Sequence, residues 1–265
     1  MEKFDSQKHG SIIRDFPFSY FSTNAHLDFE AYVFERNGEQ LVVQQDIIYP
    51  NDFPSIFLPL KKENWSNCSV LFTTPEDRLQ VEKEGIPLIT EVPVGSEFFY
   101  NTDDFINPEG NTKNRIKKFT ASYNFSLKHR WDIEEIILFY NFWKNQREHK
   151  SITFEENEEF FMFCLHNLEK QNIQQVYVEI EGKLAGLAWG VHSKSNWVGL
   201  HLKVNYQYSG LSRFIHSERA KLFSGCEMFS LGTGAHDAGI ESYKDDLGPV
   251  KKIDYSYILT GSQKD

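Results

Sequence analysis

The chain has 265 residues and a formal net charge of −10, and its 40% hydrophobic and 25% charged residues are ordinary for a globular protein. Aromatic residues make up 15%, which predicts a large buried core and argues against a disordered chain. No apolar run approaches the ~18 residues of a membrane-spanning helix, and three widely spaced cysteines offer neither a disulfide framework nor a metal-binding pattern.

Strands dominate the first predicted elements. Two runs that alternate apolar and polar residues, 29–35 and 40–46, flank Asn37-Gly38, a dipeptide typical of a tight β-hairpin turn. The other elements expected in this part are a strand at 55–60, a helix from Pro75 that has Thr74 as its N-cap and ends before Gly85, and a strand at 97–101.

Helices become more frequent after residue 108. The segment that starts at Asp132 carries a capping-box-like pair, Asp132 and Glu135, followed by apolar residues at helical spacing. A second hairpin is expected around Gly182-Lys183, and its first strand resembles the first strand of the earlier hairpin, which suggests an internal duplication. We expect helices at 112–122, 132–148, 153–170, 211–223 and 240–247, and strands at 175–181, 184–192, 197–204, 227–231 and 252–259.

The sharpest local feature is the turn between the strand ending at Val204 and the helix beginning at Leu211. A helix N-terminus presents unpaired N–H groups and the positive end of its dipole, so a turn of low bulk can bind a pyrophosphate. Gln207–Ser212 reads Q-x-x-G-x-S and resembles the Q/R-x-x-G-x-G/A loop that holds coenzyme A in GNAT enzymes, with Ser212 in place of Gly or Ala. The alternative is an ordinary strand–turn–helix connection. The residues of this predicted donor site are Val204, Gln207, Ser209, Gly210, Leu211, Ser212 and Arg213.

The C-terminal part carries a wider resemblance. Asp237, Gly239, Lys244 and Pro249 follow the order Asp-x-Gly, helix with Lys, then Pro. In this the chain resembles the GNAT-like proteins grouped with the phosphatidylglycerol lysyltransferase C-terminal domain, distant relatives of the Fem-type aminoacyl transferases. The resemblance is best over residues 97–250 and looser before them. It implies an α/β (α+β) mixed-sheet fold of two GNAT folds in tandem, with a first domain at 1–108 and a second at 109–265 that carries the donor site.

Four residues are candidates for catalysis. Lys244 stands where ordinary GNAT enzymes often place the tyrosine that protonates the departing thiolate; a lysine there resembles the Fem-type pattern and could neutralise developing charge. Tyr243, just before it, is an alternative acid, and His201 or Asp237 could serve as the base. The competing interpretations are a solvated helix with a Glu241–Lys244 pair and a structural histidine in a strand.

A basic cluster precedes these residues in the chain: Lys113, Arg115, Lys117 and Lys118. It could contact the phosphates of coenzyme A or of a tRNA acceptor end. It could equally be a solvated face that Glu134 and Glu135 balance. The sequence leaves both interpretations open.

Three functions follow. The first is an N-acyltransferase that moves an acyl group from acyl-coenzyme A, as donor substrate, to a small amine or amino acid. The second, which the resemblance implies for some members, is an aminoacyl-tRNA dependent transferase acting on a lipid, peptide or small metabolite. The third is a non-catalytic binding protein on the same fold. We expect a cytoplasmic protein because the start of the chain lacks the layout of a signal peptide, and we expect no metal.

Overall fold

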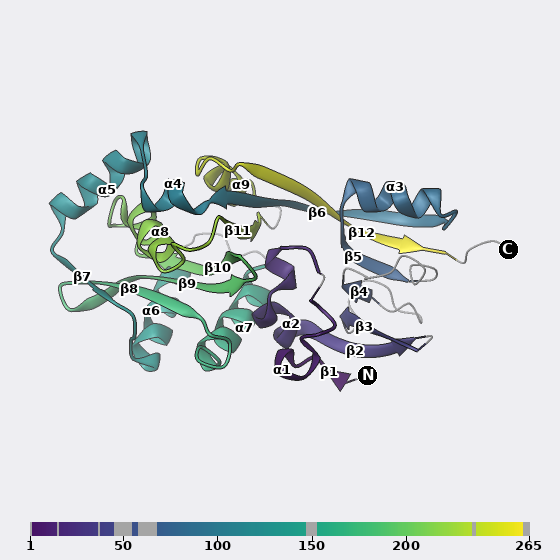
Figure 1. Ribbon diagram of the computed structural model, residues 1–265. Helices are drawn as coiled ribbons and strands as arrows, with labels where there is room; N and C mark the ends of the chain where they lie inside the picture. The colour runs from purple at the N-terminus through teal and green to yellow at the C-terminus, as the bar shows by residue number, and fades with distance from the viewer. Residues whose placement is uncertain are drawn as a thin grey trace. The chain divides into compact units, whose positions relative to one another are not determined.

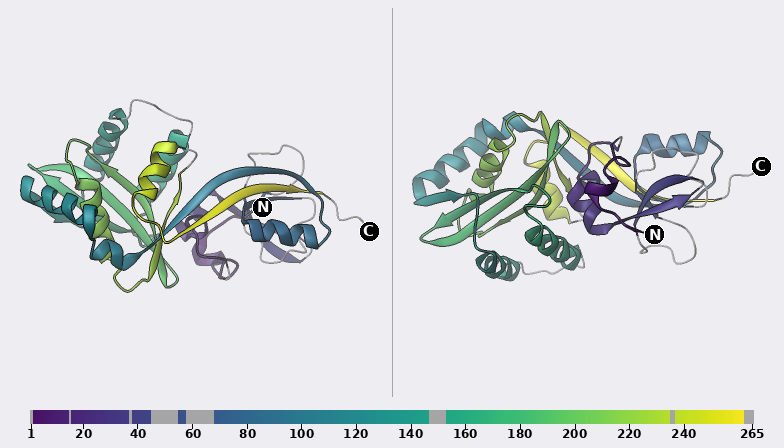
Figure 2. Two further views of the ribbon diagram at one scale, coloured as in Figure 1. Left: turned by 90° about the horizontal axis from the view of Figure 1, so that it is seen from above. Right: turned by 60° about the horizontal axis from the view of Figure 1, so that its bottom comes forward.

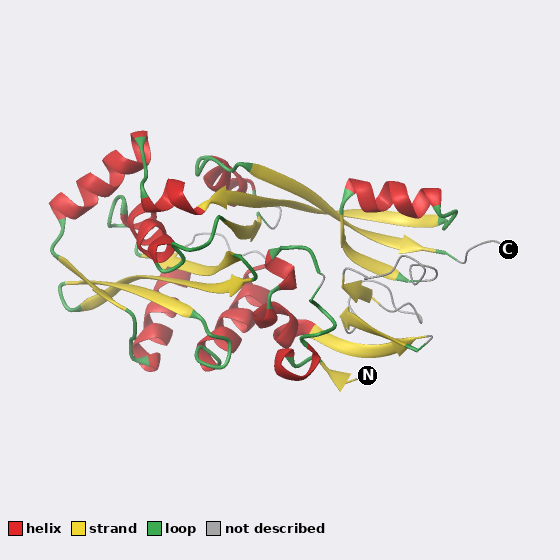
Figure 3. Cartoon of the chain, in the orientation of Figure 1, coloured by secondary structure: helices red, strands yellow, loops and turns green. Residues whose placement is uncertain are grey.

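The computed structural model describes residues 2–14, 16–36, 38–44, 55–57, 68–146, 153–234 and 237–261. They form a mixture of helices and strands (Figures 1 and 3). The chain divides into two compact units: the first consists of Met1–Phe98 with Gly232–Asp265, and the second of Phe99–Leu231. The C-terminal segment joins the first unit because β12 (Lys251–Thr260) pairs with β5 (Ser69–Thr73). The position of the boundary between the two tandem halves stays a prediction.

The first unit contains a mixed sheet in the order β1-β2-β3-β4-β5-β12-β6. Apolar side chains on one face pack with Val81 of the helix α3, and those on the other face pack with Phe4, Leu27 and other residues of the N-terminal segment. Besides β5 and β12, the elements are β1 (Glu2–Lys3), α1 (Ser6–His9), η1 (Tyr20–Ser22), α2 (Asn24–Glu30), β2 (Ala31–Arg36), β3 (Glu39–Gln44), β4 (Ser55–Phe57), α3 (Pro75–Lys83), β6 (Leu88–Asn101) and α9 (Ala238–Asp245).

Local signals explain several of these elements. The predicted hairpin is present as β2 and β3, and Gly38 adopts φ 78°, a left-handed conformation that suits glycine. The predicted helix is α3, whose Thr74 side chain accepts from the Asp77 N–H while the Asp77 side chain accepts from the Thr74 N–H, a complete capping box. The strand expected at 97–101 is much longer, because Pro93 is exposed within β6 and does not end it.

The second unit contains strands in the order β11-β10-β9-β8-β7. The helix α8 covers one face of β8–β10, and α6 and α7 cover the other (Figure 2). The elements are α4 (Thr102–Ile106), α5 (Gly110–Ser122), β7 (Phe125–Lys128), α6 (Ile133–Asn145), α7 (Thr153–His166), β8 (Gln174–Ile180), β9 (Lys183–Ser193), β10 (Asn196–Val204), α8 (Leu211–Lys221) and β11 (Met228–Thr233).

A buried arginine fastens α8 to a bulge in this sheet. The register of β10 against β9 shifts between Gly199 and His201. Arg219 of α8 is 1% exposed, and its Nη1 donates to the carbonyls of Trp189 (3.0 Å) and His201 (3.1 Å), which face each other across the two strands. Gly199 makes room for it, because a Cβ at that position would lie 2.7 Å from Arg219 Nη2. The guanidinium thus satisfies carbonyls at the irregular part of the ladder.

Candidate active site

The helix α9 presents the predicted lysine within the first unit. It begins after Asp237, whose Oδ1 accepts from the N–H groups of Gly239 (2.8 Å) and Ile240 (3.0 Å). Asp237 was predicted as a possible base, and the structure gives it the role of a helix N-cap. Lys244 lies in the last turn of the same helix, directly after the partly exposed Tyr243.

Lys244 is buried, and main-chain carbonyls hold its ammonium group. Lys244 is only 8% exposed, and its Nζ donates to the carbonyls of Gly232 (3.0 Å) and Thr233 on β11. The ring of Phe98 lies 5.8 Å from Nζ, within cation–π range. The alternative of a solvated helix face is therefore wrong for Lys244.

Burial lowers the pKa of Lys244 to about 7, although the negative charges of Glu97 and Glu241 act in the opposite direction. A lysine in water has a pKa near ~10.4 and is almost wholly charged at neutral pH. Lys244 can instead exchange a proton at physiological pH, which is the property expected of a general acid or base.

Glu97 is the acid that acts most strongly on Lys244, and it connects Lys244 to the N-terminal segment. It is fully buried on β6, and its carboxylate accepts from Ser19 Oγ (2.7 Å) and from the Tyr20 N–H (2.6 Å). The ring of Tyr20 in turn packs over Gly232, where a Cβ would lie 3.1 Å from the ring. Glu97 therefore both supplies a countercharge to Lys244 and positions the residue that covers one of its carbonyl partners.

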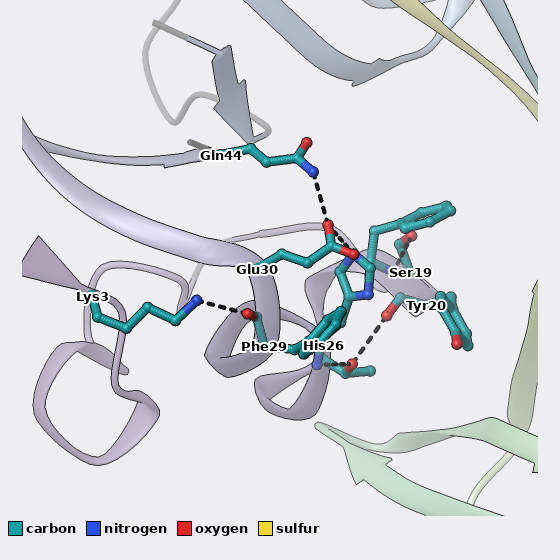
Figure 4. Close-up of polar contacts among 9 residues, drawn as sticks. Lys3, Ser19, Tyr20, His26, Phe29, Glu30 and Gln44 are labelled. Carbon is teal, nitrogen blue, oxygen red and sulfur yellow. Dashed lines mark hydrogen bonds and ion pairs between the residues drawn. The ribbon is translucent and has the colours of Figure 1, made fainter. Parts of the chain in front are cut away.

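Further residues of the first unit lie next to Tyr20 (Figure 4). His26 lies 5.7 Å from the ring of Tyr20, and burial lowers the pKa of His26. Its Nε2 is 3.6 Å from Glu30, and the carboxylate of Glu30 also accepts from the Gln44 amide at 3.1 Å. The buried imidazole thus gives Tyr20 an aromatic packing partner.

The sequence did not point to Ser19, Tyr20 or Glu97 as site residues. The available signal was weak: Glu97 precedes the apolar run Phe98-Phe99-Tyr100, and an acid beside such a run is usually exposed. Its partners Ser19 and Tyr20 are more than 70 residues away in the chain, so no local pattern connects them.

The turn predicted to hold coenzyme A has most of its amides engaged within the protein. Gly210 has φ 90° and precedes α8, as expected. Four N–H groups of the turn donate internally: Tyr206 to Gln146 Oε1 (3.0 Å), Gln207 to Asn205 Oδ1 (3.1 Å), Tyr208 to the Asn205 carbonyl (3.2 Å) and Leu211 to the Tyr208 carbonyl (3.1 Å). Of the predicted donor residues, Gln207 and Leu211 are therefore engaged within the protein, and a donor role for the rest of the turn stays a prediction.

The presence of glycine at position 210 has a structural explanation. A Cβ at this position would lie 2.5 Å from the carbonyl oxygen of Arg115 and 3.1 Å from Cβ of Phe119, both on α5. The low bulk that the sequence analysis assigned to phosphate binding thus permits the close approach of a helix. Ser212 and Arg213 follow in the first turn of α8, where Arg213 is buried, and Val204 belongs to the core of this unit. A donor role for Ser209 stays a prediction.

His201 lies in the second unit, whereas Lys244, Tyr243 and Asp237 belong to the first. Its ring is 3% exposed and packs between Phe160, Phe161 and Trp189. Burial, together with the charges of Lys203 and Arg219, holds the pKa of His201 well below its usual value. The surroundings are those of a structural histidine, and a role as base stays a prediction.

The family follows from a comparison of the sequence with protein-family models. Residues 50–254 match the model described as phosphatidylglycerol lysyltransferase, C-terminal. The chain belongs to this family. Its members are transferases by name, and the predicted resemblance is confirmed. No curated protein is similar enough in sequence to count as a match.

Solved structures show the fold. A conserved protein of unknown function from Bacteroides thetaiotaomicron has a TM-score of 0.77 at 14% identity, over 97% of this chain and 98% of the other. L-PGS from Bacillus licheniformis has a TM-score of 0.62 at 13% identity, over 100% and 93%. A tandem GNAT protein from the clavulanic acid biosynthesis pathway has a TM-score of 0.53 at 10% identity, over 100% and 98%. The chain has the mixed α/β, tandem GNAT fold that was predicted.

No helix in the ranges that the structure describes is long and apolar enough to cross a membrane. Among the same residues, no group of three or more His, Cys, Asp or Glu side chains is placed to hold a metal ion.

Proposed function

We propose that this protein is an aminoacyl transferase that uses aminoacyl-tRNA as its donor, with Lys244 as its catalytic residue. Membership of the phosphatidylglycerol lysyltransferase C-terminal family supports the reaction class. The observation that carries the proposal is the buried ammonium of Lys244, fixed by two carbonyls and having a pKa of about 7.

The chemistry needs such a group. In aminoacyl transfer a nucleophilic hydroxyl or amine of the acceptor forms a bond to the ester carbonyl carbon of the donor. Negative charge develops on the carbonyl oxygen, and the ester C–O bond then breaks to release a ribose hydroxyl of the tRNA. A fixed cation stabilises that developing charge, and the same ammonium can give its proton to the departing ribose oxygen while the acceptor loses one.

The acyl-coenzyme A hypothesis has less support. It depended on free amides in the turn before α8, and several of them donate within the protein. Gly210, its key residue, is needed for the contact with α5. Lys244 by contrast lies in the first unit, and its contacts with Gly232 and Thr233 do not involve that turn.

The family name gives phosphatidylglycerol as the first acceptor to test and a lysyl group as the first group to transfer. With the donor class proposed here, the first donor is lysyl-tRNA. The protein is incubated with tRNA that carries labelled lysine and with phosphatidylglycerol vesicles, and the label that moves into the lipid is measured. A panel of other aminoacyl-tRNAs and of amine acceptors then extends the assay. The proposal is supported if the protein transfers the amino acid from any aminoacyl-tRNA and inactivated protein does not. Turnover of acyl-coenzyme A, with micromolar coenzyme A binding in calorimetry and no use of any aminoacyl-tRNA, would contradict it.

The negative charge of Glu97 leads to a prediction about how the transfer rate depends on pH. If the ammonium of Lys244 is the active form, the transfer rate falls as pH rises through its pKa, which is about 7. The negative charge of Glu97 raises that pKa, so the Glu97→Gln variant lowers it and loses the ammonium at a lower pH. We therefore expect the alkaline limb of the kcat profile to move to lower pH in this variant.

A matched control comes from the same strand. Glu91 of β6 pairs with Arg78 at 2.8 Å and does not act on Lys244. Glu91→Gln is therefore expected to leave the limb where it is. If the alkaline limb of the kcat profile stays in place in Glu97→Gln, or moves equally in both variants, Glu97 is not a positioning residue for Lys244.

A further inference from the structure

The helix α5 is a basic surface on an acidic protein. Its four basic side chains, Lys113, Arg115, Lys117 and Lys118, are exposed, and the helix contains no acidic residue. In the part of the chain that the structure describes, none of the four has an ion pair. Glu134 and Glu135, which could have balanced them, lie in the first turn of α6 and form no ion pair with them. Among the described residues, the four charges are thus exposed to solvent, and Glu134 and Glu135 do not balance them through ion pairs.

These charges do not stabilise the helix. Lys113 and Lys117 are four residues apart, where like charges destabilise a helix. The helix has no acid in its first turn and no basic residue in its last turn, so its charges do not favour the helix dipole either. Uniform positive charge without a structural benefit indicates a partner of opposite charge.

The same helix is firmly held. Phe119 of α5 is fully buried, and its ring lies 4.9 Å from that of Phe214 on α8. On the adjoining side, Gly210 allows the turn before α8 to meet the backbone of Arg115 closely. The basic side chains thus project from a rigid support instead of a loose segment, which lowers the entropy cost of binding.

We propose that α5 is the surface on which the phosphate backbone of an RNA docks, and this rests on the proposed use of aminoacyl-tRNA. The alternative polyanion is a membrane containing anionic lipid. A helix that lies on a membrane needs exposed apolar side chains beside its basic ones. The large hydrophobic residues of α5, Ile116 and Phe119, are half-buried and buried, and apart from the small Gly110 and Ala121 the exposed residues are polar. Charge and hydrogen-bonding groups without exposed apolar area fit RNA phosphates.

The test uses the full chain with unfractionated uncharged tRNA as the probe. The variant Lys113→Gln/Lys117→Gln/Lys118→Gln removes three charges from α5. Its matched control, Lys83→Gln/Lys170→Gln/Lys183→Gln, removes three charges from exposed lysines elsewhere. We expect the α5 variant to weaken tRNA binding by about ten-fold or more and to reduce its salt dependence, and the control to change binding less than about two-fold. Circular dichroism checks that α5 variants remain folded.

A second variant tests the support without changing charge. Gly210→Ala places a methyl group 2.5 Å from the Arg115 carbonyl and so must shift α5. We expect weaker tRNA binding at unchanged net charge. The inference is overturned if the α5 triple variant and the control triple variant lose tRNA binding equally. It is also overturned if the α5 triple variant loses binding to phosphatidylglycerol vesicles while its tRNA binding is intact. If the α5 triple variant binds tRNA normally while the protein transfers aminoacyl groups, the inference about α5 is wrong and the proposed function stands. If tRNA binds through α5 but the protein transfers no aminoacyl group, the inference stands and the proposed function is wrong.

Discussion

Replacing Lys244 by methionine is expected to lower the rate of aminoacyl transfer by about 10²–10³-fold, the range seen when a group that stabilises a developing oxyanion is removed. Methionine fills a similar volume but leaves the carbonyls of Gly232 and Thr233 without this donor, so circular dichroism is used to check that the variant is folded. Binding of aminoacyl-tRNA should change little, because the predicted loss arises in the transition state. Single-turnover kinetics beside a binding titration separates the two effects.

Lys252 provides a close control for this experiment. Its Nζ lies 5.0 Å from the ring of Phe98, the same ring that Lys244 approaches, but it is exposed and pairs with Asp245. Lys252→Met should therefore keep nearly full activity. Similar losses in both variants would mean that general positive charge near Phe98 matters and that Lys244 has no special role. A Lys244→Met variant with weak donor binding and an unchanged single-turnover rate would make Lys244 a phosphate-binding residue.

The largest expected change in stability comes from Arg219. The variant Arg219→Ala leaves the carbonyls of Trp189 and His201 without their donor and opens a cavity beside Trp197. Each buried unsatisfied group costs about 1–3 kcal/mol, so we expect the free energy of unfolding to fall by about 3 kcal/mol. Urea denaturation monitored by tryptophan fluorescence measures this, since Trp189 and Trp197 are both buried in the affected region.

A control is available on the same helix. Lys221 is exposed and pairs with Glu218 of its own helix, so Lys221→Ala should cost less than about 0.5 kcal/mol. If Arg219→Ala were as mild, the carbonyls at the bulge would have found other donors, and the guanidinium would not fasten α8 to the sheet.

Sequence patterns predicted the regular elements well where a local signal was strong. The capping box at Thr74, the N-cap Asp132 and the strands of the second hairpin lie within a few residues of their predicted positions. Weak signals were missed: β7 has only four residues, three of them exposed, so it lacks the alternation of a half-buried strand.

The site was harder to predict than the fold, and Gly210 shows why. A bare glycine before a helix suits a pyrophosphate and suits a tightly packed neighbouring helix equally well, and only the position of α5 distinguishes them. Lys244 was found because a family pattern marked its position. Its burial, which determines its chemistry, comes from packing between segments that are distant in the chain.

The contacts of Glu97 have a practical consequence for anyone who trims this protein. The region that matches the family begins at residue 50, yet Ser19 and Tyr20 lie upstream of it and occupy both oxygens of a carboxylate that water does not reach. A shortened version limited to the matched region would remove these two donors of the Glu97 carboxylate and uncover Gly232. Such a fragment would report on a damaged enzyme, so the leading segment has to be kept in any functional assay.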